Sequence, residues 1–301
     1  MTDFLYKGRI ASKHLAFAYA VTTRTVQETV LRHDCDPAGA HLLGRALTAG
    51  LLAATTLPPD SRINLKWAYG GTLKTILVDA GPDATVRGMI SPNHLFDAKD
   101  AEELYGSGGT VKVIRSQNGV NLSAGTVEAG FQDPIEDFAF FLSFSDQVES
   151  ALEVLLGLAP NPGDPVRVCR GILLQALPEC DLEAFNHWRA RLNHPSIRDH
   201  LYHQNEETDN YLENILARIL EAPLAPGDLV IESLPAPRFA CTCSREKMGA
   251  VLRALPYDER MDMVKKGDNI RISCHYCREL YELTIQECIE AWNEFRKKPP
   301  A

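Results

Sequence analysis

The chain has 301 residues, of which 45% are hydrophobic and 24% are charged, and its formal net charge at pH 7 is −9. This length and composition are ordinary for a soluble globular protein with room for two domains. The negative charge argues against a protein built mainly to bind nucleic acid, because phosphate binding draws its affinity from Lys and Arg. The first residues, Met1 to Lys7, contain no basic region leading into an apolar run. We therefore expect no secretory signal and a reducing, cytoplasmic location.

The first part of the chain, between Leu15 and Pro178, mixes strand-like runs with two helical runs. Apolar and polar side chains alternate from Arg62 to Tyr69, the period of a strand with one buried face. Further strands are expected at Lys74–Asp79, Thr110–Arg115, Val120–Val127 and Val166–Leu174. Helices are expected at Asp36–Thr55 and Pro134–Phe144. The pattern predicts an α+β fold with a largely antiparallel sheet. It contains no phosphate-cradling glycine loop, so we do not expect ATP use.

The most apolar stretch of the chain runs from Ala38 to Leu57. It reaches the length of a membrane span, but it carries His41 and Arg45 and is dominated by Ala, Leu and Gly. These features favour a buried helix over a transmembrane one. We therefore expect no membrane partner.

A polar and helical segment follows, from Cys180 to about Arg238. It includes the strongly hydrophilic run 204–210 and the stretch Tyr211–Leu220, which has one apolar helical face. The helix could be packed permanently on the first domain, or it could belong to a connector that detaches. Four prolines then break the chain as a linker does, at positions 223, 226, 235 and 237.

The last sixty residues read as a small module. Ser244 is expected to cap a helix that runs through Ala254, and Pro256 to open a second one that ends at Gly267. Ile270 and Ile272 lead into a turn and Leu280 to Leu283 lead out of it, as in a hairpin. Thr284 and Glu287 form a capping box for a last helix with an apolar stripe at Ile285, Cys288, Ile289, Trp292 and Phe295. The predicted domains are 1–179, 180–238 and 239–301.

Four of the eight cysteines lie in two close pairs in this module, Cys241-Thr242-Cys243 and Cys274-His275-Tyr276-Cys277. Four thiolates suit one tetrahedral Zn²⁺ in a closed site with no position left for a catalytic water. The one-residue spacing of the first pair is unusually tight, and thiols two apart can close into a strained, labile disulfide. Spacing alone leaves open a structural zinc, a zinc-thiolate redox switch and a pair of extracellular disulfides.

The other cysteines, Cys35, Cys169, Cys180 and Cys288, have no partner at close spacing and are expected to act as small, mostly buried hydrophobes. We expect His275 to be an exposed spectator and Tyr276 to serve packing.

Two rival functions fit parts of the cysteine pattern. Cys-His-Tyr-Cys resembles a thioredoxin-type dithiol, which would make the protein an oxidoreductase, but such motifs normally open a helix in a βαβ context. A zinc ribbon that binds nucleic acid or a protein partner is favoured by local charge: the segment 238–279 has nine basic and six acidic residues, a net +3, and the remainder of the chain carries −12. The basic surroundings should also favour thiolates over thiols.

The C-terminal module resembles the zinc module of the bacterial 33-kilodalton heat shock chaperone family. The resemblance lies in the cysteine pattern, in the run Cys241-Thr242-Cys243-Ser244-Arg245-Glu246 and in the thirty-residue insert. The stretch 171–178, Gly-Ile-Leu-Leu-Gln-Ala-Leu-Pro, resembles the closing strand of that family's N-terminal domain. Gly70-Gly71-Thr72-Leu73 departs from the more Gly- and Asp-rich turn of its relatives.

The resemblance implies an ATP-independent holdase that is inactive when reduced and zinc-bound. It implies that Cys241, Cys243, Cys274 and Cys277 bind one zinc per chain, and that oxidation releases the metal as Cys241 pairs with Cys243 and Cys274 with Cys277. It further implies unfolded client proteins as partners and a homodimer when oxidised. We therefore expect a cytoplasmic, redox-regulated stress-response chaperone that is not an enzyme, with the zinc ribbon as the alternative.

Overall fold

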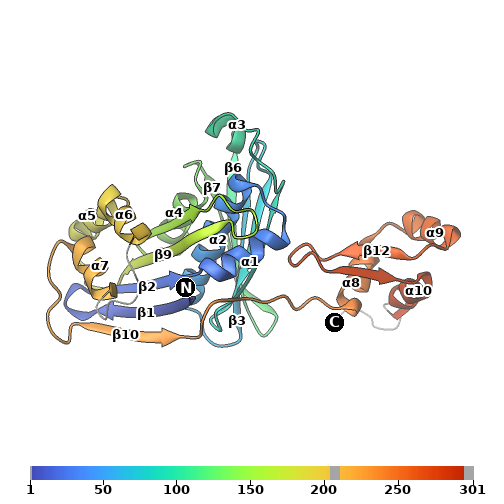
Figure 1. The fold of residues 1–301 in the computed structure, drawn as a ribbon. Helices are drawn as coiled ribbons and strands as arrows, with labels where there is room; N and C mark the ends of the chain where they lie inside the picture. The colour runs from blue at the N-terminus through green and yellow to red at the C-terminus, as the bar shows by residue number, and fades with distance from the viewer. Residues whose placement is uncertain (1, 204–210, 295–301) are drawn as a thin grey trace. The chain divides into compact units, whose positions relative to one another are not determined.

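The computed structural model describes residues 2–203 and 211–294. Its contacts divide the chain into an N-terminal unit, Met1–Ala240, and a C-terminal unit, Cys241–Ala301 (Figure 1). The predicted run 204–210 and the residue Phe295 lie outside the described residues. The three-part division at 179 and 238 stays a prediction.

Two sheets build the N-terminal unit. The five-stranded sheet has the order β10-β1-β2-β9-β8, and the six-stranded sheet has the order β11-β5-β4-β3-β6-β7. Their strands are β1 (Phe4–Ile10), β2 (Leu15–Val21), β3 (Ser61–Ala68), β4 (Thr75–Ala80), β5 (Thr85–Ser91), β6 (Gly109–Gln117), β7 (Val120–Ala129), β8 (Ser150–Leu158), β9 (Val166–Ala176), β10 (Leu229–Leu234) and β11 (Arg238–Phe239). Among the described strands, β11 and β5 pair in parallel and the other neighbours are antiparallel. The predicted α+β class with a largely antiparallel sheet is confirmed.

The N-terminal unit also contains helices, several of which pack on the sheets. They are η1 (Ala11–Lys13), α1 (Thr23–Arg32), α2 (Pro37–Ala54), α3 (Ala101–Tyr105), α4 (Pro134–Phe144), α5 (Leu182–Leu192), α6 (Pro195–His203) and α7 (Tyr211–Leu220). Asp36 caps α2, because its carboxylate accepts a hydrogen bond from the Gly39 N–H at 2.7 Å, and Pro37 fills the first helical position.

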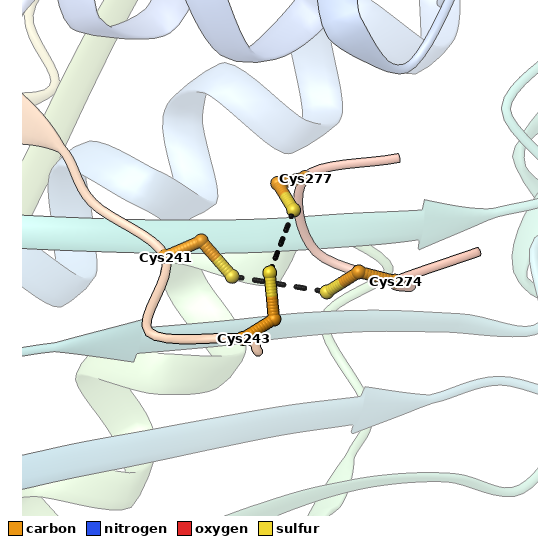
Figure 2. Close-up of side chains that lie close together, drawn as sticks. All are labelled: Cys241, Cys243, Cys274 and Cys277. Atoms are coloured by element: carbon orange, nitrogen blue, oxygen red, sulfur yellow. Dashed lines mark hydrogen bonds between the residues drawn. The ribbon is translucent and has the colours of Figure 1, made fainter. Parts of the chain in front are cut away.

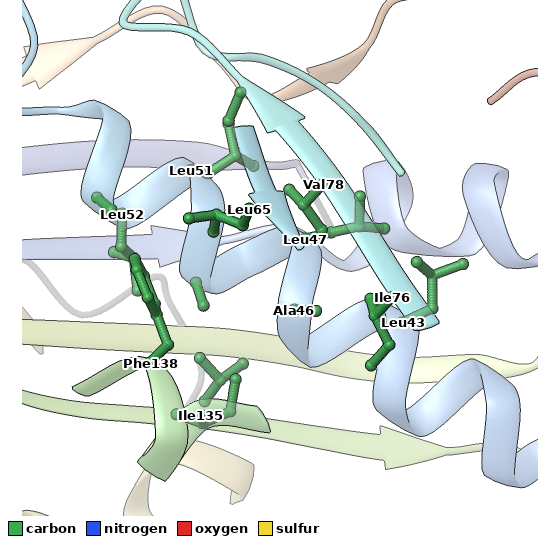
Figure 3. Packing of buried hydrophobic residues seen from close by; sticks show 14 of the residues in the cluster. Leu43, Ala46, Leu47, Leu51, Leu52, Leu65, Ile76, Val78, Ile135 and Phe138 are labelled. Atoms are coloured by element: carbon green, nitrogen blue, oxygen red, sulfur yellow. The ribbon is translucent and has the colours of Figure 1, made fainter. Parts of the chain in front are cut away.

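Helix α2 forms the centre of the N-terminal unit. Its residues pack against both the five-stranded and the six-stranded sheet, and 15 of its 18 residues are buried. Figure 3 shows part of this packing, with Leu43 and Leu47 of α2 beside Ile76 and Val78 of β4. Small residues permit this close approach: a Cβ added at Gly50 would lie 2.6 Å from Val78 Cγ1. The expectation of a buried helix is confirmed. Within the described ranges, no helix combines the length and apolarity that crossing a membrane requires.

Helices α5, α6 and α7 cover the other face of the five-stranded sheet. Their apolar side chains and those of the sheet form a second cluster, which we call the connector cluster; its buried members include Tyr19, Ile172, Phe185, Trp188, Leu192, Leu201, Ile215 and Ile219. The apolar face predicted for Tyr211–Leu220 is confirmed, and its side chains lie in the connector cluster together with those of the five-stranded sheet.

Two charged residues are buried under this helical layer. Glu153 of β8 lies with Oε1 3.4 Å from Arg198 Nε of α6, and burial raises the pKa of the Glu153 carboxyl. Arg170 of β9 donates a hydrogen bond to the Leu201 carbonyl at 2.5 Å, and its guanidinium lies 5.7 Å from the ring centre of Tyr211. Removing two charges from water has a cost that such contacts offset only in part. The interface is therefore less stabilising than an apolar one of the same size.

Several strands were not predicted. Strand β2, Leu-Ala-Phe-Ala-Tyr-Ala-Val, is buried on both faces, so it lacks the apolar-polar alternation of a half-exposed strand. Strand β10 lies inside the segment expected to be polar and helical, where it pairs with β1 at the edge of the five-stranded sheet. The prolines at 223, 226, 235 and 237 therefore flank a strand.

The C-terminal unit follows the predicted order. It contains α8 (Arg245–Val251), η2 (Leu252–Ala254), α9 (Tyr257–Lys266), the antiparallel pair β12 (Ile270–Ser273) and β13 (Leu280–Leu283), and α10 (Ile285–Glu294). Ser244 accepts a hydrogen bond from the Lys247 N–H at 3.3 Å, and Gly267 ends α9 in a left-handed conformation with φ 69°. The capping box is present: the Thr284 N–H donates to Glu287 at 2.7 Å, and the Glu287 N–H donates to Thr284 Oγ1 at 3.3 Å.

The packing of α7 gives a stability prediction. Ile215 is fully buried in the connector cluster, so Ile215→Ala should destabilise this layer by roughly 2 to 5 kcal/mol through lost burial and a cavity. Urea unfolding and hydrogen exchange of the α7 amides would measure the loss. Glu213→Ala, at an exposed position of the same helix, is the control and should change little. Unchanged exchange in Ile215→Ala would contradict the packing of α7 on the sheet.

Candidate metal centre

The four predicted cysteine ligands come from two separate stretches of the chain. Cys241 and Cys243 lie in the extended segment just before α8, whose N-cap is the next residue, Ser244. Cys274 and Cys277 lie in the turn between β12 and β13. This turn is closed by hydrogen bonds from the Cys274 N–H to the Glu279 carbonyl and from the Arg278 N–H to the Cys274 carbonyl, both at 2.9 Å.

The structure brings the four sulfur atoms together (Figure 2). Their Sγ atoms all lie within 4.8 Å of one another. The Sγ–Sγ distance is 3.7 Å between Cys241 and Cys274, and 3.3 Å between Cys243 and Cys277. A tetrahedral zinc with Zn–S bonds of about 2.3 Å requires sulfur atoms about 3.8 Å apart. The donor set therefore fits a zinc ion in number, chemistry and spacing.

The protonation state of these thiols depends on whether a metal ion is bound. Burial raises the pKa of Cys243 and of Cys277 above the usual range of a thiol. In Cys243 this effect is opposed by hydrogen bonds from Tyr281 and Cys277. A coordinating divalent cation deprotonates its thiol ligands outright. The set is therefore suited to a metal cation, which would keep four neighbouring sulfurs ionised.

The expectation that basic surroundings favour thiolates is wrong for Cys243 and Cys277. The nearby cations are engaged elsewhere: Arg245 pairs with Glu287 at 2.7 Å, and Lys247 Nζ donates to the Thr242 carbonyl at 2.5 Å. These side chains are exposed, where water screens their charge.

Sequence reasoning missed one polar neighbour of the cluster. The Tyr281 hydroxyl lies 3.1 Å from Cys243 Sγ, and this contact raises the pKa of the phenol. Tyr281 stands four residues after Cys277 on the outgoing strand of the hairpin, opposite Ile272. The predicted hairpin would have placed it near the turn, but which sulfur it reaches depends on how the first cysteine pair folds back.

The other predicted residues lie as follows. Cys169 and Cys288 are buried, whereas Cys35 and Cys180 are only partly buried. His275 is exposed and Tyr276 half-buried. In the described part of the C-terminal unit, the hydrophobic cluster has four buried members: Leu252, Leu283, Cys288 and Trp292. Cys288 thus serves packing, as expected.

Comparison with known proteins identifies the family. Residues 3–284 match the family model described as Hsp33 protein. The chain belongs to the Hsp33 family. A 33 kDa chaperonin of Bacillus licheniformis is 30% identical over 294 residues, which cover 95% of this chain and 97% of the relative. The 33 kDa chaperonin of Bacillus subtilis is 29% identical over 292 residues, covering 95% and 96%.

A solved structure shares the fold. The crystal structure of the Hsp33 homologue from Thermotoga maritima superposes with a TM-score of 0.81 at 22% identity, and the match covers 99% of this chain and all of the other. Membership of the Hsp33 family supports a chaperone function in the stress response, which implies binding of client proteins. The relatives named above are bacterial.

Removal of one sulfur tests the ligand set. Cys243→Ser takes away one of four ligands, and since loss of an outer-shell partner alone costs 10- to 100-fold in metal affinity, we expect zinc affinity to fall by more than roughly 100-fold. The C-terminal unit should also loosen under reducing conditions. Chelator competition would measure affinity, and hydrogen exchange the fold. Cys180→Ser is the control; a folded, zinc-replete Cys243→Ser protein would refute the four-thiolate site.

Proposed function

We propose that this protein is a redox-regulated, ATP-independent holdase of the bacterial cytoplasm. The observation that carries the proposal is the convergence of four cysteine sulfurs within 4.8 Å in a chain of the Hsp33 family. In the reduced state Cys241, Cys243, Cys274 and Cys277 hold one zinc ion as thiolates. Bound zinc supplies the charge that keeps the sulfurs ionised, and it crosslinks the segment before α8 to the β12–β13 turn.

Oxidation removes the ligands. Each pair of thiolates gives two electrons to one molecule of hydrogen peroxide, and two protons come from the solvent. One S–S bond forms, the O–O bond breaks, two water molecules leave, and the zinc ion loses two of its ligands. We propose the pairs Cys241 with Cys243 and Cys274 with Cys277. The disulfides close very short loops, so they restrict the unfolded chain little and do not replace the stability lost with the metal.

Loss of the metal has a large effect because the unit is small. Structural zinc contributes on the order of 10 to 16 kcal/mol in zinc-finger peptides. The hydrophobic cluster in the described part of the C-terminal unit has only four buried members, so its apolar burial cannot replace the stabilisation lost with the zinc. The oxidised unit therefore unfolds.

The segment 180–238 is the proposed connector between this event and client binding. Its helices α5–α7 cover the connector cluster, and the buried Glu153 and Arg170 lower the cost of lifting them, because both regain water when the layer opens. Lifting the layer exposes the apolar face of α7, with Leu212, Ile215, Leu216 and Ile219, and the sheet beneath it. Exposed apolar surface captures unfolded proteins. The active form is proposed to be a homodimer, with no nucleic-acid or membrane partner.

Peroxide treatment tests this proposal. The reduced protein is exposed to peroxide at mildly elevated temperature, and zinc release is followed together with the aggregation of a thermally unfolding client. We expect one zinc released per chain, a rise in suppression of aggregation, and reversal of both by reductant.

The same peroxide treatment distinguishes the redox-regulated holdase from the alternative, a structural zinc ribbon. A structural zinc ribbon that binds nucleic acid or a protein partner should resist mild oxidation. Retained zinc, or zinc release without a rise in holdase activity, would therefore contradict the redox switch.

A further inference from the structure

Helix α4 is apolar on its solvent face as well as on its core face. Ile135, Phe138, Phe141 and Leu142 point into the core and are buried. On the outer face Phe140 is 36% exposed and Phe144 67% exposed, and Phe131, just before the helix, is 52% exposed. A helix at the surface of a globular unit normally carries polar residues on this face. Packing in the core therefore does not account for the three exposed phenylalanines.

The three rings form a continuous row, which we call the phenylalanine ladder (Phe131, Phe140, Phe144). The ring centres of Phe131 and Phe140 lie 5.6 Å apart, and those of Phe140 and Phe144 lie 5.3 Å apart with nearly parallel planes. The separations are those of favourable aromatic pairs. The ladder thus presents a preformed apolar surface in place of three independently moving side chains.

A groove of about 320 Å³ adjoins the ladder. Phe131 and Phe140 form one wall, Ala151 and Leu152 of β8 line it, and Leu192 at the end of α5 contributes from the other side. This volume is at the small end for a ligand pocket, and it suits one or two apolar side chains rather than a large cofactor.

The charges at the groove are of both signs. Glu136 is exposed at its rim, and Arg189 is paired with Glu149. A surface that binds nucleic acid or an anionic membrane requires an excess of positive charge. The groove therefore fits a partner that offers apolar side chains and little net charge.

We propose that the phenylalanine ladder and its groove bind the apolar side chains of an unfolded polypeptide client. This inference rests on the proposed holdase function and assigns part of its client surface. Continuity favours this occupant: Ala151 and Leu192, which line the groove, are also members of the connector cluster. When the α5–α7 layer loosens, the groove loses its α5 wall and merges with the newly exposed apolar surface. A client held at the ladder is thus next to the surface that oxidation uncovers.

Binding of a permanently unfolded polypeptide, reduced and carboxymethylated α-lactalbumin, tests the inference with the oxidised full-length protein. We expect F140S/F144S to bind the probe roughly tenfold more weakly than the wild type, the scale of loss when aromatic contact residues are truncated. Phe144→Ser alone, at the more exposed position, should lose part of this affinity. Phe96→Ser is the control, because Phe96 is 80% exposed but lies outside the ladder. Zinc release on oxidation should be unchanged in all three variants.

A photo-crosslinking amino acid in place of Phe144 gives an independent readout that does not depend on the fold of the serine variants. We expect a crosslink to the probe, and none from the same group in place of Phe96. A crosslink from position 144 to a second copy of the chain, in place of the probe, would identify a dimer interface and overturn the inference. Equal binding by wild type and F140S/F144S would also overturn it, and would leave the holdase function standing. An oxidised wild type that binds no probe would overturn both.

Discussion

The convergence of four cysteine sulfurs is the constraint on which the C-terminal unit depends. The sulfurs come from an extended segment before α8 and from the β12–β13 turn, which are separated by thirty residues. Beyond the sulfurs, Arg245 joins α8 to α10 through Glu287, but this pair is exposed, and exposed ion pairs contribute little to stability. The hydrophobic cluster in the described part of the C-terminal unit has four buried members. A bound metal would thus dominate the stability of this unit, and loss of the metal would destabilise the whole unit.

The N-terminal unit is stabilised in the opposite way. Helix α2 is buried between two sheets, and its small residues permit backbone contacts so close that an added methyl group would clash. No single interaction dominates such a closely packed core. The layer formed by α5–α7 differs, since it covers Glu153 and Arg170. The chain therefore combines a closely packed centre with a helical cover that lies over two buried charged residues.

The elements of this fold that could be predicted from the sequence are those whose pattern is local. Elements that depend on burial or on a distant strand could not be predicted. The strand at Arg62–Tyr69 was predictable because one of its faces is exposed, and the caps Ser244 and Thr284 because their bonds are local. Strand β2 was not, because burial on both faces removes the alternation. Strand β10 exists only because β1 offers an edge 220 residues earlier in the chain. The spacing of the four cysteines predicted that their sulfurs converge, as they do, but the pKa values of Cys243 and Cys277 depend on burial, which no spacing reveals.

A holdase that is inactive until oxidised has to limit the apolar surface that it shows beforehand. Permanently exposed patches beyond a few hundred square ångströms favour self-association. Three phenylalanines on α4 form a small patch, whereas the connector cluster under α5–α7 includes nineteen buried side chains. The smaller surface can remain exposed without aggregation, but the larger one has to stay covered until a client is present. A cover held by modest packing over buried charge meets this need, because its opening requires less energy than unfolding the centre. Under the proposed function, the metal site supplies the signal and the connector cluster supplies the surface.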